Sequence, residues 1–166
     1  CALKLARKWG GRGRHVVVSA LGSFHGRTLA TLHATGQPQK HEAFQPLPEG
    51  FRHVEWNNLD ALASALDPSV AAVLLEPVQG EGGFNTAPTA LLQHLRTLCD
   101  QHGILLIADE VQTGAGRTGK WFAIEHSGVA PDLITMAKSM AGGFPISAVV
   151  GRADVMDAPA PGGLGG

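Results

Sequence analysis

The chain has 166 residues, of which 44% are hydrophobic and only 16% are charged, and its formal net charge is −1. This apolar content can bury the core of one domain, which excludes a disordered chain. The charge balance provides no basic surface for nucleic acid and no acidic tail for a cationic partner. Soluble domains are about one quarter charged, so the low charged fraction predicts that further segments or a partner cover part of the surface.

The two cysteines, Cys1 and Cys99, form no CxxC pair. They exclude a disulfide framework and predict a reducing compartment, which we take to be the cytoplasm. No stretch reaches the roughly 18 apolar residues that a membrane-spanning helix needs. Apart from His25, the other seven of the eight histidines sit singly, without the spacing of metal ligands, so we predict no metal site.

The first third of the chain predicts two helices and one strand. The apolar stripe of residues 2–9 predicts a helix that begins before residue 1, and the β-branched run at 15–19 predicts a buried strand. Residues 27–33 fit a second helix. The glycines and prolines of residues 36–50 predict an irregular segment.

From residue 51 onward, strands and helices alternate. Several strands are continuous apolar runs, such as AAVLL and ILLIA, which are typical of a parallel sheet covered on both faces. The pattern therefore predicts an α/β fold, a three-layer sandwich with a mainly parallel sheet. The predicted strands are 51–56, 71–75, 104–108, 133–136 and 146–150, and the predicted helices are 59–66 and 89–102.

Three of these strands end in residues suited to chemistry. Glu76, Asp109 and Lys138 each follow an apolar run, and open α/β sheets bind ligands at the carboxyl ends of their strands. We expect Lys138 and Asp109 to be buried beside an apolar floor. A lysine with apolar neighbours has its charge disfavoured, so its amine can form a Schiff base with an aldehyde. An aspartate can keep a pyridine nitrogen protonated. These are the two roles that proteins play in pyridoxal phosphate (PLP) chemistry.

Four longer motifs, in this order and spacing, resemble the class III PLP-dependent aminotransferases. The resemblance implies a fold type I enzyme that acts as a homodimer. It also implies that residues 1–166 are part of the large domain, with the small domain and the phosphate-binding N-terminal turn outside this chain, so we expect the chain alone to be inactive. The motifs are Ser23–Thr28 (SFHGRT), Leu75–Gly83 (LEPVQGEGG), Ala108–Gly119 (ADEVQTGAGRTG) and Ala137–Pro145 (AKSMAGGFP).

The resemblance also implies roles for single residues. Lys138 forms the Schiff base with PLP and moves the proton, and Asp109 pairs with the pyridine nitrogen. Gln112 reaches the ring hydroxyl. The other implied cofactor contacts are Phe24 and Val111, on opposite faces of the ring, His25 beside Phe24, and Glu76 as an acid lining the pocket.

Two further residues are implied to select the substrate. Arg27 matches the family arginine that binds a substrate carboxylate, for which a planar bidentate fork is well suited. Glu81 matches the glutamate that masks a second arginine when the donor has no α-carboxylate. We expect that second arginine to lie beyond residue 166.

Different segments of the sequence resemble aminotransferases that use two different amino donors. Residues 4–9, 24–29 and 45–50 resemble acetylornithine aminotransferases, whereas 84–88, 102–109 and 157–166 resemble 4-aminobutyrate aminotransferases. We therefore predict ping-pong transamination from 4-aminobutyrate or a similar ω-amino acid to 2-oxoglutarate. Acetylornithine is the alternative donor, and an aminomutase or decarboxylase also stays open.

Two interpretations outside this family also stay open. Residues 114–119 satisfy GxGxxG, which can mark a dinucleotide site, although five residues separate the preceding strand from the first glycine. The chain could also be a fragment that serves only in assembly, without catalysis.

Overall fold

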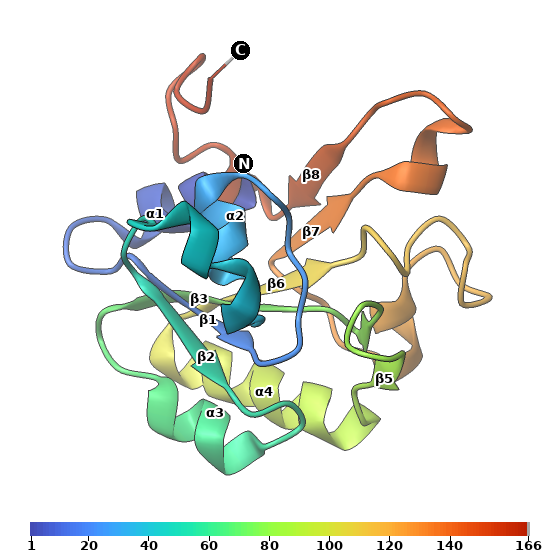
Figure 1. Cartoon of the computed structure of the whole chain (residues 1–166), viewed down its shortest axis with the longest axis horizontal. Helices are drawn as coiled ribbons and strands as arrows, with labels where there is room; N and C mark the ends of the chain where they lie inside the picture. Colours follow the sequence, from blue (N-terminus) through green and yellow to red (C-terminus); the bar gives the residue numbers. More distant parts are fainter. Residues whose placement is uncertain (166) are drawn as a thin grey trace.

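The continuous apolar runs form the central strands of a six-stranded sheet in the computed structural model, which describes residues 1–165 (Figure 1). The strand order is β2-β1-β3-β6-β7-β8. Every neighbouring pair is parallel except β7 and β8. The strands are β1 (Val16–Ala20), β2 (Phe51–Val54), β3 (Val70–Leu75), β6 (Leu105–Asp109), β7 (Leu133–Met136) and β8 (Ala148–Gly151).

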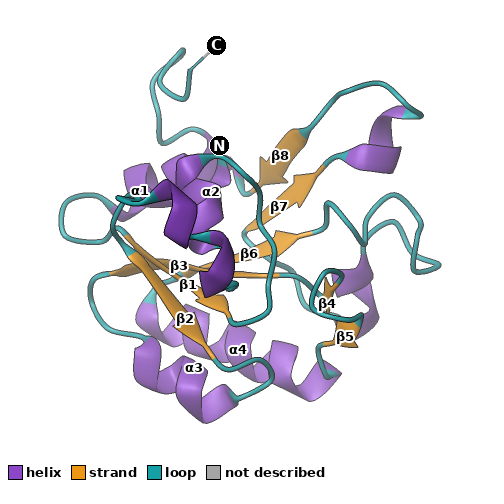
Figure 2. Cartoon of the chain, in the orientation of Figure 1, coloured by secondary structure: helices purple, strands orange, loops and turns teal. Residues whose placement is uncertain are grey.

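Helices cover both faces of the sheet, which confirms the predicted three-layer α/β sandwich (Figure 2). One face carries α1 (Ala2–Gly10), α2 (Leu29–Ala34) and α5 (Ala153–Met156). The other carries α3 (Leu59–Ala65) and α4 (Thr89–His102). Among residues 1–165, no helix is long and apolar enough to span a membrane.

Strand β3 shows why the core has two halves. All six of its residues are buried, and side chains of a strand alternate between the faces of the sheet. Val73 and Leu75 pack into the core beneath α3 and α4, whereas Ala72 and Leu74 pack into the core beneath α1. A strand buried on both faces must be apolar throughout, as the sequence predicted.

Several elements were not predicted. A two-stranded antiparallel sheet joins β4 (Val78–Gln79) to β5 (Asn85–Thr86), and these strands are too short to show any periodicity. The segment expected to be irregular contains two 3₁₀ helices. The 3₁₀ helices of the described chain are η1 (Pro38–Lys40), η2 (Glu42–Phe44), η3 (Ala123–Ser127) and η4 (Lys138–Ala141).

A buried carboxylate holds the antiparallel edge of the sheet. Asp132 accepts hydrogen bonds from Arg96 Nη1 on α4, from Arg152 Nη1 beside β8 and from the Leu106 amide of β6, each at 2.7 Å. A buried charge is tolerated only when it is paired and hydrogen-bonded. Asp132 therefore connects α4, β6 and β8.

Three of the histidines do not sit singly, contrary to the sequence-based expectation. The rings of His33, His41 and His53 lie with centroids 5.5 to 6.1 Å apart, because α2, the loop after it and β2 bring them together. Each ring is hydrogen-bonded to a backbone carbonyl: His33 to that of Pro48, His41 to that of Thr35, and His53 to that of His33. No cluster in residues 1–165 has the arrangement of a metal site.

This histidine cluster predicts a loss of stability in acid. Burial lowers the pKa of His53 from its ordinary value of 6.5, and the neighbouring His41 and His33 rings lower it further, against the raising effect of the His33 carbonyl. The unfolded chain therefore binds the proton more readily. The contribution of His53 to stability is present above about pH 6.5 and is lost as the pH falls below that value, through the lower pKa of the folded state.

We expect His53→Gln to lose less of its thermal midpoint than the unaltered protein between about pH 7.5 and about pH 5. His94→Gln, on the exposed side of α4, serves as the control and should lose as much as the unaltered protein. Equal losses in all three proteins would contradict the prediction.

Candidate active site

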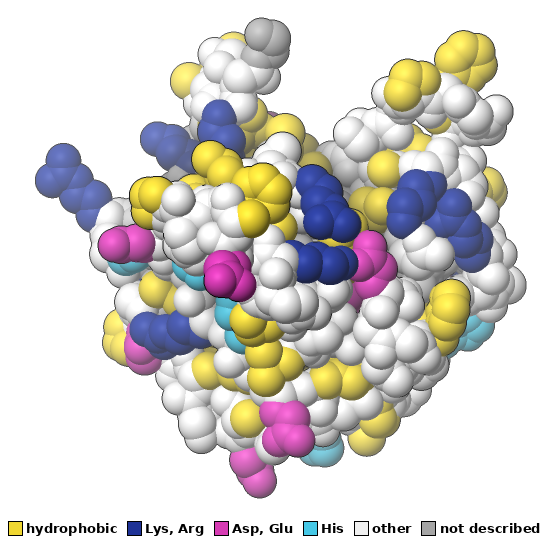
Figure 3. Space-filling view, viewed as in Figure 1, with side chains coloured by type: hydrophobic (Ala, Val, Ile, Leu, Met, Phe, Trp, Pro, Cys, Tyr) yellow, Lys and Arg dark blue, Asp and Glu magenta, His cyan; other side chains and the backbone are white. Residues whose placement is uncertain are grey.

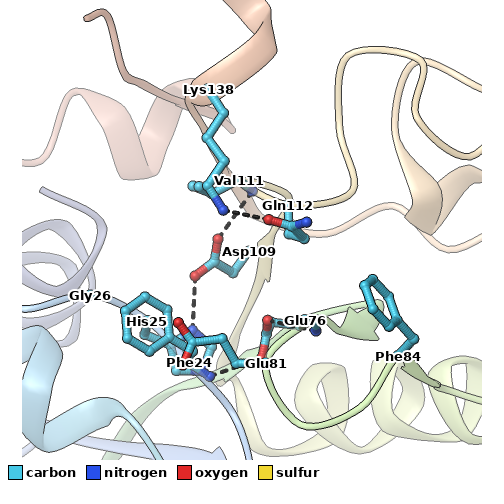
Figure 4. A pocket seen from close by; sticks show the side chains of 11 residues that line it. Phe24, His25, Gly26, Glu76, Glu81, Phe84, Asp109, Val111, Gln112 and Lys138 are labelled. Carbon is cyan, nitrogen blue, oxygen red and sulfur yellow. Dashed lines mark hydrogen bonds and ion pairs between the residues drawn. The ribbon is translucent and has the colours of Figure 1, made fainter.

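A cavity of about 350 Å³ lies at the carboxyl ends of β3, β6 and β7, where the sequence placed the candidate chemistry (Figure 4). Of the nine predicted site residues, only Arg27 is not part of its lining. The eight that line it are Phe24, His25, Glu76, Glu81, Asp109, Val111, Gln112 and Lys138.

Asp109 is the most firmly held of these side chains. Its Oδ2 lies 2.8 Å from His25 Nδ1, and its Oδ1 accepts from the Thr135 hydroxyl at 2.9 Å and the Val111 amide at 3.2 Å. Burial opposes ionisation, but the His25 contact and these two hydrogen bonds outweigh it and lower the pKa of Asp109. An ionised carboxylate only accepts, so His25 Nδ1 is the donor.

Glu76 is a second buried carboxyl in the same cavity. It accepts hydrogen bonds from the backbone amides of Phe24 at 3.0 Å and Gly80 at 3.3 Å. Burial raises its pKa, and the nearby Asp109 charge adds to that rise, against the opposing effects of His25 and the two amides. The cavity thus holds two carboxyl groups whose pKa values shift in opposite directions, an arrangement typical of sites that divide acid and base roles.

Lys138 reaches this cavity from a strained backbone position. It follows β7 as the first residue of η4, and its φ of 54° lies in the left-handed region, which costs about 1–2 kcal/mol for a residue other than glycine. Its Nζ donates to Gln112 Oε1. The residue is exposed, so the expected burial of Lys138 was wrong: its apolar sequence neighbours do not enclose it in this chain.

The loop after β6 is held close to the cavity by its own contacts. Arg117 Nη1 donates to the Val111 carbonyl at 3.0 Å and to the Gln112 carbonyl at 2.8 Å. Gly80 allows Gln112 to approach, because a Cβ on Gly80 would lie only 2.9 Å from Gln112 Cγ. The absence of a side chain at Gly80 therefore makes room for the Gln112 side chain.

Over residues 1–166 the chain matches the family model for class-III aminotransferases. The chain belongs to this family.

The relatives of this chain are named for different amino donors. The chain is 54% identical to the 5-aminovalerate aminotransferase DavT of Pseudomonas putida, over 99% of this chain and 42% of DavT. It is 47% identical to the acetylornithine aminotransferase of Methanopyrus kandleri, over 99% of this chain and 42% of that protein. The chain therefore spans about two fifths of the length of these relatives.

A solved structure supports the fold. The ornithine aminotransferase of Toxoplasma gondii, which holds PLP at partial occupancy in its active site, matches with a TM-score of 0.93 and 40% identity. The match covers 99% of this chain and 41% of that structure. The expected fold type I architecture is thereby confirmed.

The rim of the cavity includes a charged residue that the sequence analysis did not name. Arg27 is exposed, and its Cζ lies 5.3 Å from the centroid of the Phe24 ring. Glu81 forms an ion pair with Lys40, whose Nζ lies 4.8 Å from the same centroid. Lys40 was not among the predicted site residues, since it lies in the segment expected to be irregular.

The GxGxxG segment of this aminotransferase chain does not form a dinucleotide site. Residues 114–118 form successive turns and Gly119 a bend. In such a site the third glycine opens a helix, whereas the next helical element within residues 1–165 is η3, which begins at Ala123.

The sequence also gave no role to two supporting residues, Thr135 and Glu110. Thr135 pairs with Asp109 in the register of β7 on β6, so aligning the two strands would have found it. Glu110 is buried and accepts from the Ala123 amide at 3.0 Å, the Ile124 amide at 2.8 Å and the Thr113 hydroxyl. It anchors the start of η3 and closes the loop that carries Val111.

Replacing this anchor should loosen the cavity. In Glu110→Gln an amide nitrogen would face backbone donors, and we expect a lower thermal midpoint, with a loss of about 2 kcal/mol, and weaker PLP binding in a spectroscopic titration. Glu49→Gln, at an exposed position, is the matched control. A variant as stable as this control would show that Glu110 does not hold the loop.

Proposed function

We propose that this chain provides the cofactor-binding part of a PLP-dependent aminotransferase. The observation that carries the proposal is one cavity with an amine and a buried, ionised carboxylate: Lys138 and Asp109 both line it. A lysine amine can condense with the aldehyde of PLP. A carboxylate with a lowered pKa can keep a cationic ring nitrogen protonated.

The other lining residues also suit PLP. Phe24 offers an aromatic face and Val111 an apolar one, and ligand cavities combine such surfaces with a few fixed polar groups. When bound, PLP supplies an electron sink for proton removal beside the amino nitrogen. We therefore assign the cofactor contacts to Phe24, His25, Glu76, Asp109, Val111, Gln112 and Lys138.

Proton transfer and the orientation of the reacting groups are assigned to residues of this chain. Lys138 Nζ accepts and returns the proton, and Gln112 Oε1, which accepts a hydrogen bond from that nitrogen, orients it. His25 Nδ1 and the Thr135 hydroxyl hold the Asp109 carboxylate in one orientation. A charge that is already oriented needs no reorganisation during the reaction.

For the amino donor, we propose an ω-amino acid such as 4-aminobutyrate or 5-aminovalerate, with 2-oxoglutarate as acceptor. The 54% identity to DavT supports this choice. These donors carry a carboxylate far from the reacting amino group, and the exposed guanidinium of Arg27 is suited to bind it.

Acetylornithine is the second candidate donor. The 47% identity to the Methanopyrus kandleri acetylornithine aminotransferase favours it. Its reacting amine is also distant from its carboxylate, so the same placement of Arg27 would serve.

For the whole protein, we propose a homodimer in the cytoplasm, in which this chain is part of the large domain. The two-fifths coverage of the relatives supports a division into this domain and further segments. The expected masking of a second arginine by Glu81 stays a prediction.

Lys138 should be the Schiff-base residue. Borohydride reduction of the complete, PLP-loaded protein should attach the pyridoxyl group to Lys138, as shown by peptide mapping. Lys138→Arg should abolish the label and Lys120→Arg should retain it. A label on another lysine would refute the assignment.

Asp109 should act through its charge. Asp109→Asn keeps the shape but cannot hold a ring nitrogen protonated, so kcat should fall at least about a hundredfold, or about 2.7 kcal/mol. The control is Asp60→Asn, at an exposed position on α3. Near-normal turnover of Asp109→Asn with PLP bound would show that Asp109 is not the acid that keeps the ring nitrogen protonated.

A further inference from the structure

Three charged side chains gather at the rim of the cavity, around the Phe24 ring. Lys40 Nζ lies 4.8 Å and Arg27 Cζ 5.3 Å from the ring centroid, and Lys40 also pairs with Glu81. On this face of the molecule, Lys and Arg side chains gather beside an acidic side chain near the hollow (Figure 3).

Lys40 is held in this place by its surroundings. It ends η1, and its amide donates to the Gln37 carbonyl at 2.9 Å. The Gln37 side chain donates in turn to the Ser23 carbonyl at 3.0 Å, next to Phe24. The Lys40 side chain is only 22% exposed, so its contact with Glu81 is partly shielded from solvent.

The charge of Glu81 would otherwise oppose an anionic substrate. Its side chain is 44% exposed and lines the cavity. The hydrogen bond from Lys40 is the largest influence on its pKa, which is lowered, so Glu81 is negative at neutral pH. Arg27, Lys40 and Glu81 together carry one net positive charge, and without Lys40 they would carry none.

We propose that Lys40 is a specificity-determining residue: by cancelling the charge of Glu81 whenever that carboxylate is not paired with the second arginine expected beyond residue 166, it lets the rim and Arg27 accept substrates that carry a carboxylate. This proposal rests on the aminotransferase function proposed above. Lys40 acts through Glu81 and is a positioning residue, because it does not line the cavity itself.

The test uses the complete, PLP-loaded protein and glutarate, an unreactive dicarboxylate, as the binding probe. Lys40→Gln should weaken glutarate binding and raise the KM for 2-oxoglutarate by about fivefold at low salt, the size expected of a partly exposed charge. kcat should stay within about twofold, and the difference should shrink as ionic strength rises.

Three further variants separate this role from a structural one. Lys40→Arg should bind glutarate as the unaltered protein does. Lys40→Gln combined with Glu81→Gln should recover most of the lost affinity, because no charge is left to cancel. Lys120→Gln, at an exposed position away from the cavity lining, should change nothing.

The outcomes are distinguishable. If Lys40→Gln behaves like Lys120→Gln, or if the double variant recovers no affinity, the role of Lys40 is refuted while the aminotransferase function stands. If the unaltered protein forms no glutamate from any donor tested and Lys138 takes no pyridoxyl label, the proposed function fails, and this inference fails with it.

Discussion

Two consecutive buried carboxylates at the end of β6 fix the geometry of the cavity. Successive side chains of a strand point to opposite faces: Asp109 lines the cavity, and Glu110 turns to the start of η3. A buried charge requires donors, and His25, Val111 and Thr135 supply them to Asp109. Thr113, Ala123 and Ile124 supply them to Glu110. One strand end thus orders the cavity wall and the loop behind it.

The floor and the rim of the cavity differ in charge. At the floor, Asp109 is held ionised, whereas burial raises the pKa of Glu76 and favours its neutral form. At the rim, Arg27 and Lys40 outweigh Glu81. This distribution suits a ligand that is cationic at its inner end and anionic at its outer end, as a protonated pyridine ring and a substrate carboxylate would be together.

The sequence predicted best what is set by local patterns. Helix α4 has the bounds that were predicted, and both of its ends are marked locally: Pro88 precedes it and Gly103 ends it in the left-handed conformation. The buried strands were recognisable as apolar runs. What the sequence missed depends on contacts between distant segments: the cluster of His33, His41 and His53, and the exposure of Lys138, which is set by what encloses it in space.

The same division separates the floor of the cavity from its rim. The floor residues Asp109 and Glu76 are at or next to strand ends, and their positions follow from the sheet. The rim residues Arg27, Lys40 and Glu81 lie in loops and in one 3₁₀ helix, where a substitution changes charge without disturbing the sheet. The charge of the rim can therefore vary while the floor of the cavity is kept. In the role proposed for Lys40, the rim selects among substrates by charge, because Lys40 cancels the charge of Glu81 that a substrate carboxylate would otherwise meet.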